Sequence, residues 1–145
     1  MKAIIQRVNN AKLFIKNELY SEISKGALIL VCITKSDNEE SISNFLNYLQ
    51  QIKLFENSNS QLAESIVSRN YSILLVSQFT LSGRLINNEW DFSNSAKMNA
   101  AKKIYEKLVF ALNECYPNKI ATGIFGEFMN IDSENYGPVT FIYEE

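Results

Sequence analysis

An uninterrupted apolar run over residues 27–33 constrains the fold of this chain more than any other feature of its sequence. The run follows Gly26 and contains no polar residue, which is typical of a strand buried on both faces of a sheet. It is far too short to span a bilayer. A second run, residues 73–76, forms the buried centre of a strand predicted over residues 72–78. The chain is therefore expected to build a sheet around these two strands and to cover it with helices.

Apolar residues at helical spacing predict two long helices. The first is expected to begin after Asp37, which can cap its first turn, where two glutamates favour the positive end of the helix dipole. The second is expected to begin near Ser93 or Ser95 and to end at about Cys115, shortly before Pro117. The apolar stripes are Ile42, Phe45, Leu46, Leu49 and Ile52 in the first helix, and Ala101, Ile104, Leu108, Leu112 and Cys115 in the second.

Four further segments are expected to complete the sheet. Residues 3–8 and 11–16 alternate as two strands of a hairpin that would turn at Asn9 and Asn10. Another strand is expected within residues 119–131 and a last one over residues 139–143, whereas residues 56–60 form a loop. Because the 145 residues contain no repeat, linker or low-complexity segment, we expect a single α/β domain over residues 1–145. In that domain two long helices cover one mixed sheet.

The sequence contains no histidine. That absence excludes Ser-His-Asp and Cys-His catalysis, histidine ligation of a metal and a histidine general base. Cys32 and Cys115 lie outside any C-x-x-C spacing and among apolar neighbours, so we expect buried thiols, with no disulfide and no metal site. The first residues contain no signal-peptide core, and the net charge is only −2. A soluble cytoplasmic protein is expected, with no cofactor and no global field that would attract nucleic acid.

Two segments carry groups that suit catalysis or binding. Residues 77–81, S-Q-F-T-L, place hydroxyls and an amide at the end of a predicted strand, where α/β sheets hold ligand-contacting groups. The alternative is that these side chains only satisfy nearby backbone groups. Residues 122–140 contain three of the five glycines and the pair Gly137–Pro138. This pair is either a tight turn into the last strand or a rigid bend whose backbone groups recognise something small.

Taken together, these segments make the chain resemble the D-aminoacyl-tRNA deacylases from end to end. The opening M-K-A-I-I-Q-R-V is similar to the start of that family. Residues 77–81 match its S-Q-x-T-L motif, and residues 135–140 match its N-x-G-P-V-T motif, with G-x-F-G before it at residues 123–126. The resemblance implies a mixed, mostly antiparallel sheet with a barrel-like core and two long helices. It also implies hydrolysis of the ester of D-aminoacyl-tRNA, with mischarged glycyl-tRNA as a second substrate.

The resemblance further implies where the active site lies. The family forms homodimers in which Gly137 and Pro138 of one subunit, joined by a cis peptide bond, would meet the substrate beside the catalytic turn of the other. Their carbonyls would leave room for hydrogen on one side of Cα and exclude an L side chain. The implied catalytic residues are Ser77, Gln78, Phe79 and Thr80; the implied substrate-binding residues are Gly137, Pro138, Arg7, Phe125 and Met129. Arg7 would hold the Gly-Pro loop with its planar fork, or would be an exposed strand charge.

The implied reaction needs little chemical assistance from side chains. An aminoacyl ester is already activated, and the neighbouring 2′-hydroxyl of the terminal adenosine can help to position or activate water. Backbone amides near Phe79 and Thr80 would then stabilise the oxyanion. A covalent role for the Thr80 hydroxyl is the alternative, but no base adjoins Thr80 in the sequence.

The chain departs from the family pattern in residues 84–92, which carry Trp90 and little positive charge, and at Glu127, Phe128 and Tyr136. The alternatives to the enzyme are therefore a catalytically inactive module that binds the tRNA 3′ end and a purely structural dimer. Four lysines around the second helix form the densest basic cluster, which either contacts the tRNA backbone or is a solvated helix face. They are Lys97, Lys102, Lys103 and Lys107.

Overall fold

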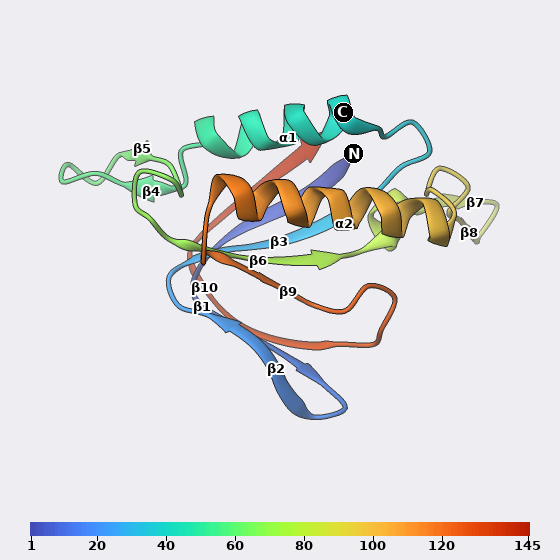
Figure 1. Cartoon of the computed structure of the whole chain (residues 1–145), viewed down its shortest axis with the longest axis horizontal. Helices are drawn as coiled ribbons and strands as arrows, with labels where there is room; N and C mark the ends of the chain where they lie inside the picture. Colours follow the sequence, from blue (N-terminus) through green and yellow to red (C-terminus); the bar gives the residue numbers. More distant parts are fainter.

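The computed structural model describes residues 1–145 and contains a six-stranded sheet, two long helices on one of its faces and two short hairpins (Figure 1). The strand order is β10-β1-β3-β6-β9, with β2 paired to β1. The sheet consists of β1 (Lys2–Ile15), β2 (Glu18–Ile23), β3 (Gly26–Cys32), β6 (Ser72–Ser77), β9 (Ile120–Thr122) and β10 (Asn130–Glu144). Only the pairs β3–β6 and β6–β9 are parallel, so the mixed, mostly antiparallel sheet is confirmed.

The sheet curves until its ends nearly meet. The Ser21 hydroxyl of β2 donates a hydrogen bond of 2.9 Å to the Thr122 carbonyl of β9. This contact joins β2, which pairs with β1, to β9, the edge strand beside β6. The sheet is therefore nearly closed into a barrel. The two shorter hairpins, β4 (Phe55–Glu56) with β5 (Leu62–Glu64) and β7 (Arg84–Ile86) with β8 (Glu89–Asp91), project from the body of the molecule (Figure 1).

The apolar run of residues 27–33 forms the central strand β3, which is buried on both faces as predicted. Ala27, Ile29 and Val31 face the helices and belong to the larger core. Leu28 faces the opposite way, into a smaller core enclosed by the curl of the sheet. Because side chains of a strand alternate between faces, a strand between two cores needs apolar residues at every position.

The first helix, α1 (Glu39–Gln51), has the predicted apolar stripe, with Ile42, Phe45 and Leu49 buried. Its predicted cap is wrong. Asn38 caps the helix, because its side-chain oxygen accepts hydrogen bonds from the N–H groups of Glu40 and Ser41. Asp37 instead accepts hydrogen bonds from the N-terminal ammonium and from the Thr34 N–H group, and so ties the start of the chain to the loop before α1.

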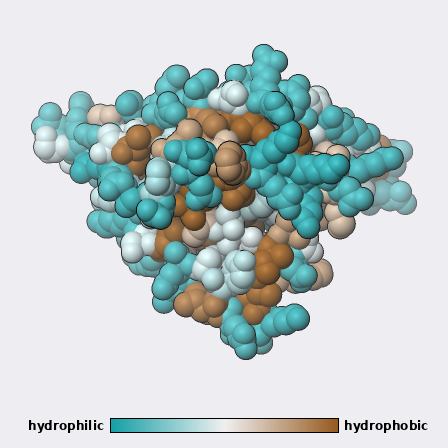
Figure 2. Space-filling view, in the orientation of Figure 1, coloured by the Kyte–Doolittle hydropathy of each residue, from teal (hydrophilic) through white to brown (hydrophobic).

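The second helix, α2 (Met98–Cys115), begins three residues after Ser95 and ends where predicted. Ala101, Leu108 and Leu112 are buried as expected, but Cys115 is exposed, so only Cys32 is a buried thiol. Tyr105 lies in the core instead, where its hydroxyl donates a hydrogen bond of 2.9 Å to the Leu75 carbonyl. On the side of the molecule that carries the two helices, hydrophilic residues alternate with hydrophobic patches (Figure 2). Neither helix has the length and apolar character needed to cross a membrane.

Two predicted strand boundaries are wrong. The chain does not turn at Asn9 and Asn10, because β1 continues through them to Ile15. The hairpin turns instead at Lys16 and Asn17, whose positive φ angles of 53° and 66° form the tight turn. The last strand, β10, begins nine residues before the predicted position at Val139. In both cases a local irregularity of the strand resembles a turn in the sequence.

Candidate active site

The S-Q-F-T-L segment forms the turn that follows β6. Gln78 leaves the strand, and Phe79–Ser82 form the single-turn 3₁₀ helix η1. The Phe79 carbonyl anchors this turn, because it accepts hydrogen bonds from the hydroxyls of Ser82 (2.9 Å) and Ser95 (3.2 Å) and from the Cys32 thiol (3.5 Å). The first N–H groups of such a turn have no acceptor within it. They are therefore available to an anionic group of a ligand.

Thr80 lies exposed on η1. Its hydroxyl donates a hydrogen bond of 2.9 Å to the amide oxygen of Gln78. An amide oxygen is not a base that could activate the hydroxyl as a nucleophile. No three His, Cys, Asp or Glu side chains come together as ligands for a metal ion. The turn therefore offers backbone amides and a polar pair of side chains.

The Gly137–Pro138 pair lies inside β10 and does not form a turn before the last strand. Gln6 pairs with Thr140 and Val8 pairs with Asn135, so residues 136–139 of β10 bulge opposite Arg7 alone. The peptide bond between Gly137 and Pro138 is cis, and Gly137 has a φ of +116°. The bulge takes this peptide out of the regular pairing with β1.

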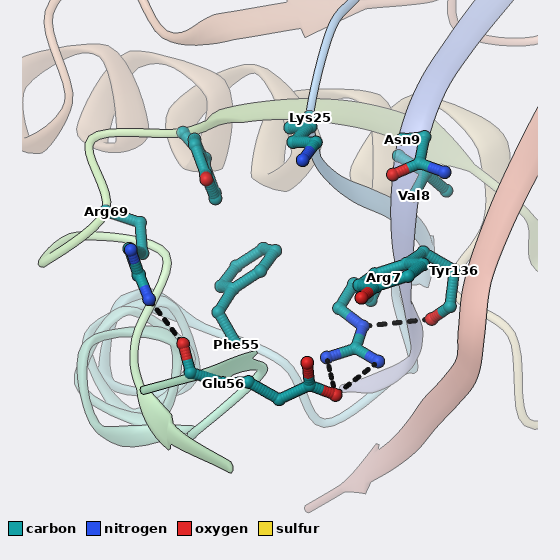
Figure 3. Close-up of a pocket in the computed structure, with 9 residues that line it drawn as sticks. Arg7, Val8, Asn9, Lys25, Phe55, Glu56, Arg69 and Tyr136 are labelled. Carbon is teal, nitrogen blue, oxygen red and sulfur yellow. Dashed lines mark hydrogen bonds and ion pairs between the residues drawn. The ribbon is translucent and has the colours of Figure 1, made fainter. Parts of the chain in front are cut away.

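Arg7 holds the bulge from the neighbouring strand (Figure 3). Its side chain is buried, and its Nε donates a hydrogen bond of 2.9 Å to the Tyr136 carbonyl. Nη1 donates to the Leu54 carbonyl at 3.1 Å, and Glu56 lies 3.4 Å from both Nη atoms. The guanidinium also lies 4.4 Å from the centre of the Tyr136 ring. The exposed-charge alternative for Arg7 is therefore wrong, and its planar fork joins the bulge to the β4 region.

A cavity of about 220 Å³ lies beside Arg7 and the bulge (Figure 3). The side chains around it include Lys25, Phe55, Glu56, Arg69 and Tyr136. The sequence did not predict this cavity, because its residues come from five separate segments. None of the candidate catalytic residues at 77–80 lines it. The cavity therefore lies beside the Gly-Pro bulge and away from the S-Q-F-T-L turn.

The two motifs lie at opposite ends of the sheet within one chain. Ser77 pairs with Val31, which pairs with Ala3, whereas Gly137 lies opposite Arg7, four residues further along β1. Four residues span about 13 Å along a strand, and three strand spacings from β6 to β10 add about 14 Å across the sheet. The two motifs are therefore about 20 Å apart, too far to touch one substrate carbon.

Comparisons with known proteins agree with the motifs. The family model described as D-Tyr-tRNA(Tyr) deacylase matches residues 4–144. A protein of Schizosaccharomyces pombe named D-aminoacyl-tRNA deacylase is 37% identical over 146 aligned residues, which cover 99% of this chain and 98% of that protein.

The chain belongs to the D-Tyr-tRNA(Tyr) deacylase family.

Solved structures show that this deacylase also has the fold of its family. A structure titled c-Myc DNA Unwinding Element Binding Protein superposes with a TM-score of 0.95 at 31% identity, covering 100% of this chain and 99% of that one. A probable eukaryotic D-amino acid tRNA deacylase superposes with a TM-score of 0.87 at 15% identity, covering 98% and 97%. The second likeness concerns the fold alone.

The candidate residues of this deacylase form two groups. Ser77, Gln78, Phe79 and Thr80 lie together at the carboxyl end of β6. The β9–β10 loop lies at the same end, because the Gly123 N–H group donates to the Leu75 carbonyl. In that loop Phe125 packs on the larger core, 5.5 Å from the Tyr105 ring, whereas Met129 packs on the smaller core. Arg7, Gly137 and Pro138 form the second group at the other end.

The basic cluster around the second helix is partly neutralised. Lys107 pairs with Glu39 at 2.5 Å, and Lys102 lies 3.9 Å from Glu106. Lys97 and Lys103 have no ion-pair partner, and Lys97 is the residue before the helix. The lysines therefore do not form one continuous positive stripe. The two paired lysines form exposed ion pairs, as expected of a solvated helix face.

Proposed function

We propose that this D-aminoacyl-tRNA deacylase works as a homodimer, in which the Gly137–Pro138 bulge of one copy faces the S-Q-F-T-L turn of the other. The observation that supports this arrangement is the separation of about 20 Å between the two motifs in one chain, estimated from strand spacings. If both motifs contact one substrate, a second copy has to supply one of them. A two-fold axis that crosses the strands would bring the bulge end of one sheet over the turn end of the other.

An apolar row that is only partly covered supports the same contact. Ile4 pairs with Leu30 on one side and with Ile142 on the other, so the three side chains lie side by side on the face turned away from the helices. Ile142 is 73% exposed, although it stands in the middle of a strand pair. Apolar side chains that remain in water on a sheet face are typical of a protein interface. A second copy related by a two-fold axis would place the same row against this one and remove Ile142 from water.

In this arrangement the Gly-Pro carbonyls read the chirality of the amino acid. They leave room for a hydrogen atom on one side of the substrate Cα and exclude the side chain of an L-amino acid. Rejection of the abundant L ester is a matter of repulsion, so it needs no specific pocket for each D side chain. Glycine has no side chain to exclude, and mischarged glycyl-tRNA is accordingly a second substrate in this proposal.

The ester is cleaved by water with help from the RNA. The 2′-hydroxyl of the terminal adenosine positions or activates the water, which attacks the ester carbonyl carbon. The negative charge that develops on the carbonyl oxygen is stabilised by the backbone amides of Phe79 and Thr80. The bond to the ribose oxygen then breaks, that oxygen takes up a proton, and free D-amino acid and tRNA leave.

Replacement of Thr80 by alanine is expected to lower kcat/KM for D-tyrosyl-tRNA by less than about tenfold. The reason is that the hydroxyl is held by Gln78 and the proposed oxyanion donors are backbone amides, which alanine keeps. A substrate that lacks the terminal 2′-hydroxyl is expected to lose at least about 100-fold, the usual contribution of a positioned acid–base group. Single-turnover kinetics measure both. A loss above about 1000-fold for the Thr80 variant, with tRNA binding unchanged, would instead favour a covalent acyl-threonine.

The function is tested by release of amino acid from matched D-tyrosyl-tRNA and L-tyrosyl-tRNA with enzyme far below substrate. We expect rapid multiple turnover of the D ester and no release from the L ester, with glycyl-tRNA cleaved as well. Loss of both tyrosyl esters would contradict the chiral role of Gly137 and Pro138. Binding of tRNA without turnover of any ester would identify the inactive tRNA-end module instead.

A further inference from the structure

An exposed row of aromatic rings leads from the candidate catalytic turn to the tip of the β7–β8 hairpin. The Phe79 ring meets the Phe92 ring edge-on, with ring centres 5.1 Å apart. The Phe92 ring in turn lies nearly parallel to the Trp90 ring, at 18° and 6.3 Å between centres. Phe79 is 59% exposed and Trp90 is 66% exposed. The reaction described above uses the backbone of Phe79 and gives no role to Trp90.

The hairpin that carries Trp90 is a fixed ribbon. Its turn residues Asn87 and Asn88 have φ angles of 50° and 66°, as in the tight turns that match strand twist. Arg84 pairs with Asp91 across the ribbon at 3.0 Å, and Asp91 also accepts hydrogen bonds from the N–H and hydroxyl groups of Ser93. These bonds to Ser93, followed by the contact with Arg84, hold the pKa of Asp91 below its usual value. The ion pair and the bonds to Ser93 link the two strands of the hairpin to the segment that follows them.

The exposed ring of Trp90 suits stacking on a nucleic acid base, and two unpaired lysines lie near the segment that follows Phe92. One face of the indole packs against Phe92, and most of the rest is open to water. A flat aromatic face stacks on a base of any sequence. Lys35 and Lys97 are exposed and have no ion-pair partner among the contacts of this structure. Both lie next to the segment that follows Phe92, since the Lys35 N–H group donates to the Asn94 carbonyl.

We propose that Trp90 stacks on the base of the nucleotide that precedes the ester-bearing nucleotide of the aminoacyl-tRNA. The inference rests on the proposed function, which places the ester at Thr80. Phe79, the neighbour of Thr80, is the ring nearest the nucleotide that carries the ester. Trp90 lies one ring further from the reacting bond, where the preceding nucleotide of the unpaired 3′ strand runs. Lys35 and Lys97 then lie beside the phosphates of that strand.

The chain has a single tryptophan, so fluorescence excited selectively at tryptophan reports on the surroundings of Trp90. Titration with uncharged tRNA is expected to quench the emission to saturation, because a base stacks on the indole. tRNA that lacks the last nucleotide is expected to quench as fully at saturation, and tRNA that lacks the last two is expected not to quench. Anisotropy of labelled tRNA confirms binding in each case. The proposal would be overturned if tRNA bound without quenching the emission. It would also be overturned if the emission were already blue-shifted before RNA is added, or if removal of the last nucleotide alone abolished the quenching.

Kinetics give a second, independent readout. Trp90→Ala is expected to raise KM for D-tyrosyl-tRNA about tenfold with kcat nearly unchanged, and Trp90→Phe is expected to restore most of the affinity. Phe110→Ala is the matched control, since Phe110 is an equally exposed aromatic residue (68%) on α2. An unchanged KM in Trp90→Ala, or an equal effect in Phe110→Ala, would overturn the assignment. If the protein showed this quenching but did not hydrolyse D-tyrosyl-tRNA, the proposed function would be contradicted, whereas the stacking contact would still hold.

Discussion

Gly137→Ala is expected to lower the ratio of D-ester to L-ester hydrolysis by about 100-fold. A Cβ atom at this position would lie 2.7 Å from Nη2 of Arg7 and 3.1 Å from Cγ2 of Val139, and Gly137 has a φ of +116° that L residues rarely adopt. Arg7 is buried and bonded to two carbonyl groups, so it cannot withdraw. The bulge has to move instead, which opens space for the side chain of an L-amino acid; a shift of about 1 Å in the group that excludes it is expected to change the relative rates by on the order of 100-fold.

Gly126→Ala is the matched control for this variant. Gly126 also has a positive φ, of +85°, but no atom lies within 4 Å of the position that its Cβ would take. The control therefore shares the backbone strain, about 1–3 kcal/mol, and lacks the clash. Matched D-tyrosyl-tRNA and L-tyrosyl-tRNA are compared for both variants, with circular dichroism to verify the fold. A folded Gly137→Ala protein that keeps the wild-type ratio would show that the bulge does not read chirality.

Arg7→Ala is expected to lower the free energy of unfolding by about 2–5 kcal/mol and to reduce the D-to-L ratio at least tenfold. Removal of the guanidinium leaves the carbonyls of Tyr136 and Leu54 without their donors and frees the bulge. Urea unfolding at one fixed protein concentration measures the stability, since a dimer adds concentration dependence. Arg7→Lys keeps the charge, but an ammonium cannot reproduce a fork that reaches several acceptors. It is expected to fold and still to lose selectivity.

Glu56→Gln distinguishes the effect of the ion pair of Arg7 from the effect of its hydrogen bonds to carbonyl groups. Glu56 lies 3.4 Å from Arg7, and its side chain is 38% exposed, so the pair contributes less than about 1 kcal/mol. The variant leaves both carbonyl contacts of Arg7 in place and is expected to keep the D-to-L ratio. If Glu56→Gln lowered the ratio as much as Arg7→Lys does, charge pairing would position the bulge. The planar fork would then not be the decisive feature.

The strands and helices that depend on local patterns could be predicted from the sequence. The apolar run at 27–33 and the stripe of Ile42, Phe45 and Leu49 correspond to β3 and α1, because burial on one or two faces requires a fixed spacing of apolar residues. The errors lie where one local pattern has two meanings. Two consecutive asparagines at 9 and 10 resemble a turn but continue β1, and the glycine and proline at 137 and 138 form a bulge inside β10.

The candidate site divides in the same way. Its residue types and their order were readable in the sequence, as S-Q-F-T-L and N-x-G-P-V-T, and they led to the family that the comparisons show. The row of Phe79, Phe92 and Trp90 was not readable, because it depends on how the β7–β8 hairpin folds back on η1. The cavity beside Arg7 was equally hidden, since β4 and the segment around Tyr71 reach it only in the folded chain.

The sequence by itself therefore determined the family, the two buried strands, the two helical stripes and the absence of histidine chemistry, since each depends on residue identity or on spacing along the chain. Only the tertiary structure decided that Arg7 is buried, that it binds the carbonyl of Tyr136, and that the two motifs lie at opposite ends of the sheet. The physical reason is strand register. Which residues face each other across β10, β1, β3 and β6 is set by pairing between segments that are distant in the sequence, more than 100 residues apart in the case of β1 and β10, and no local pattern encodes that pairing.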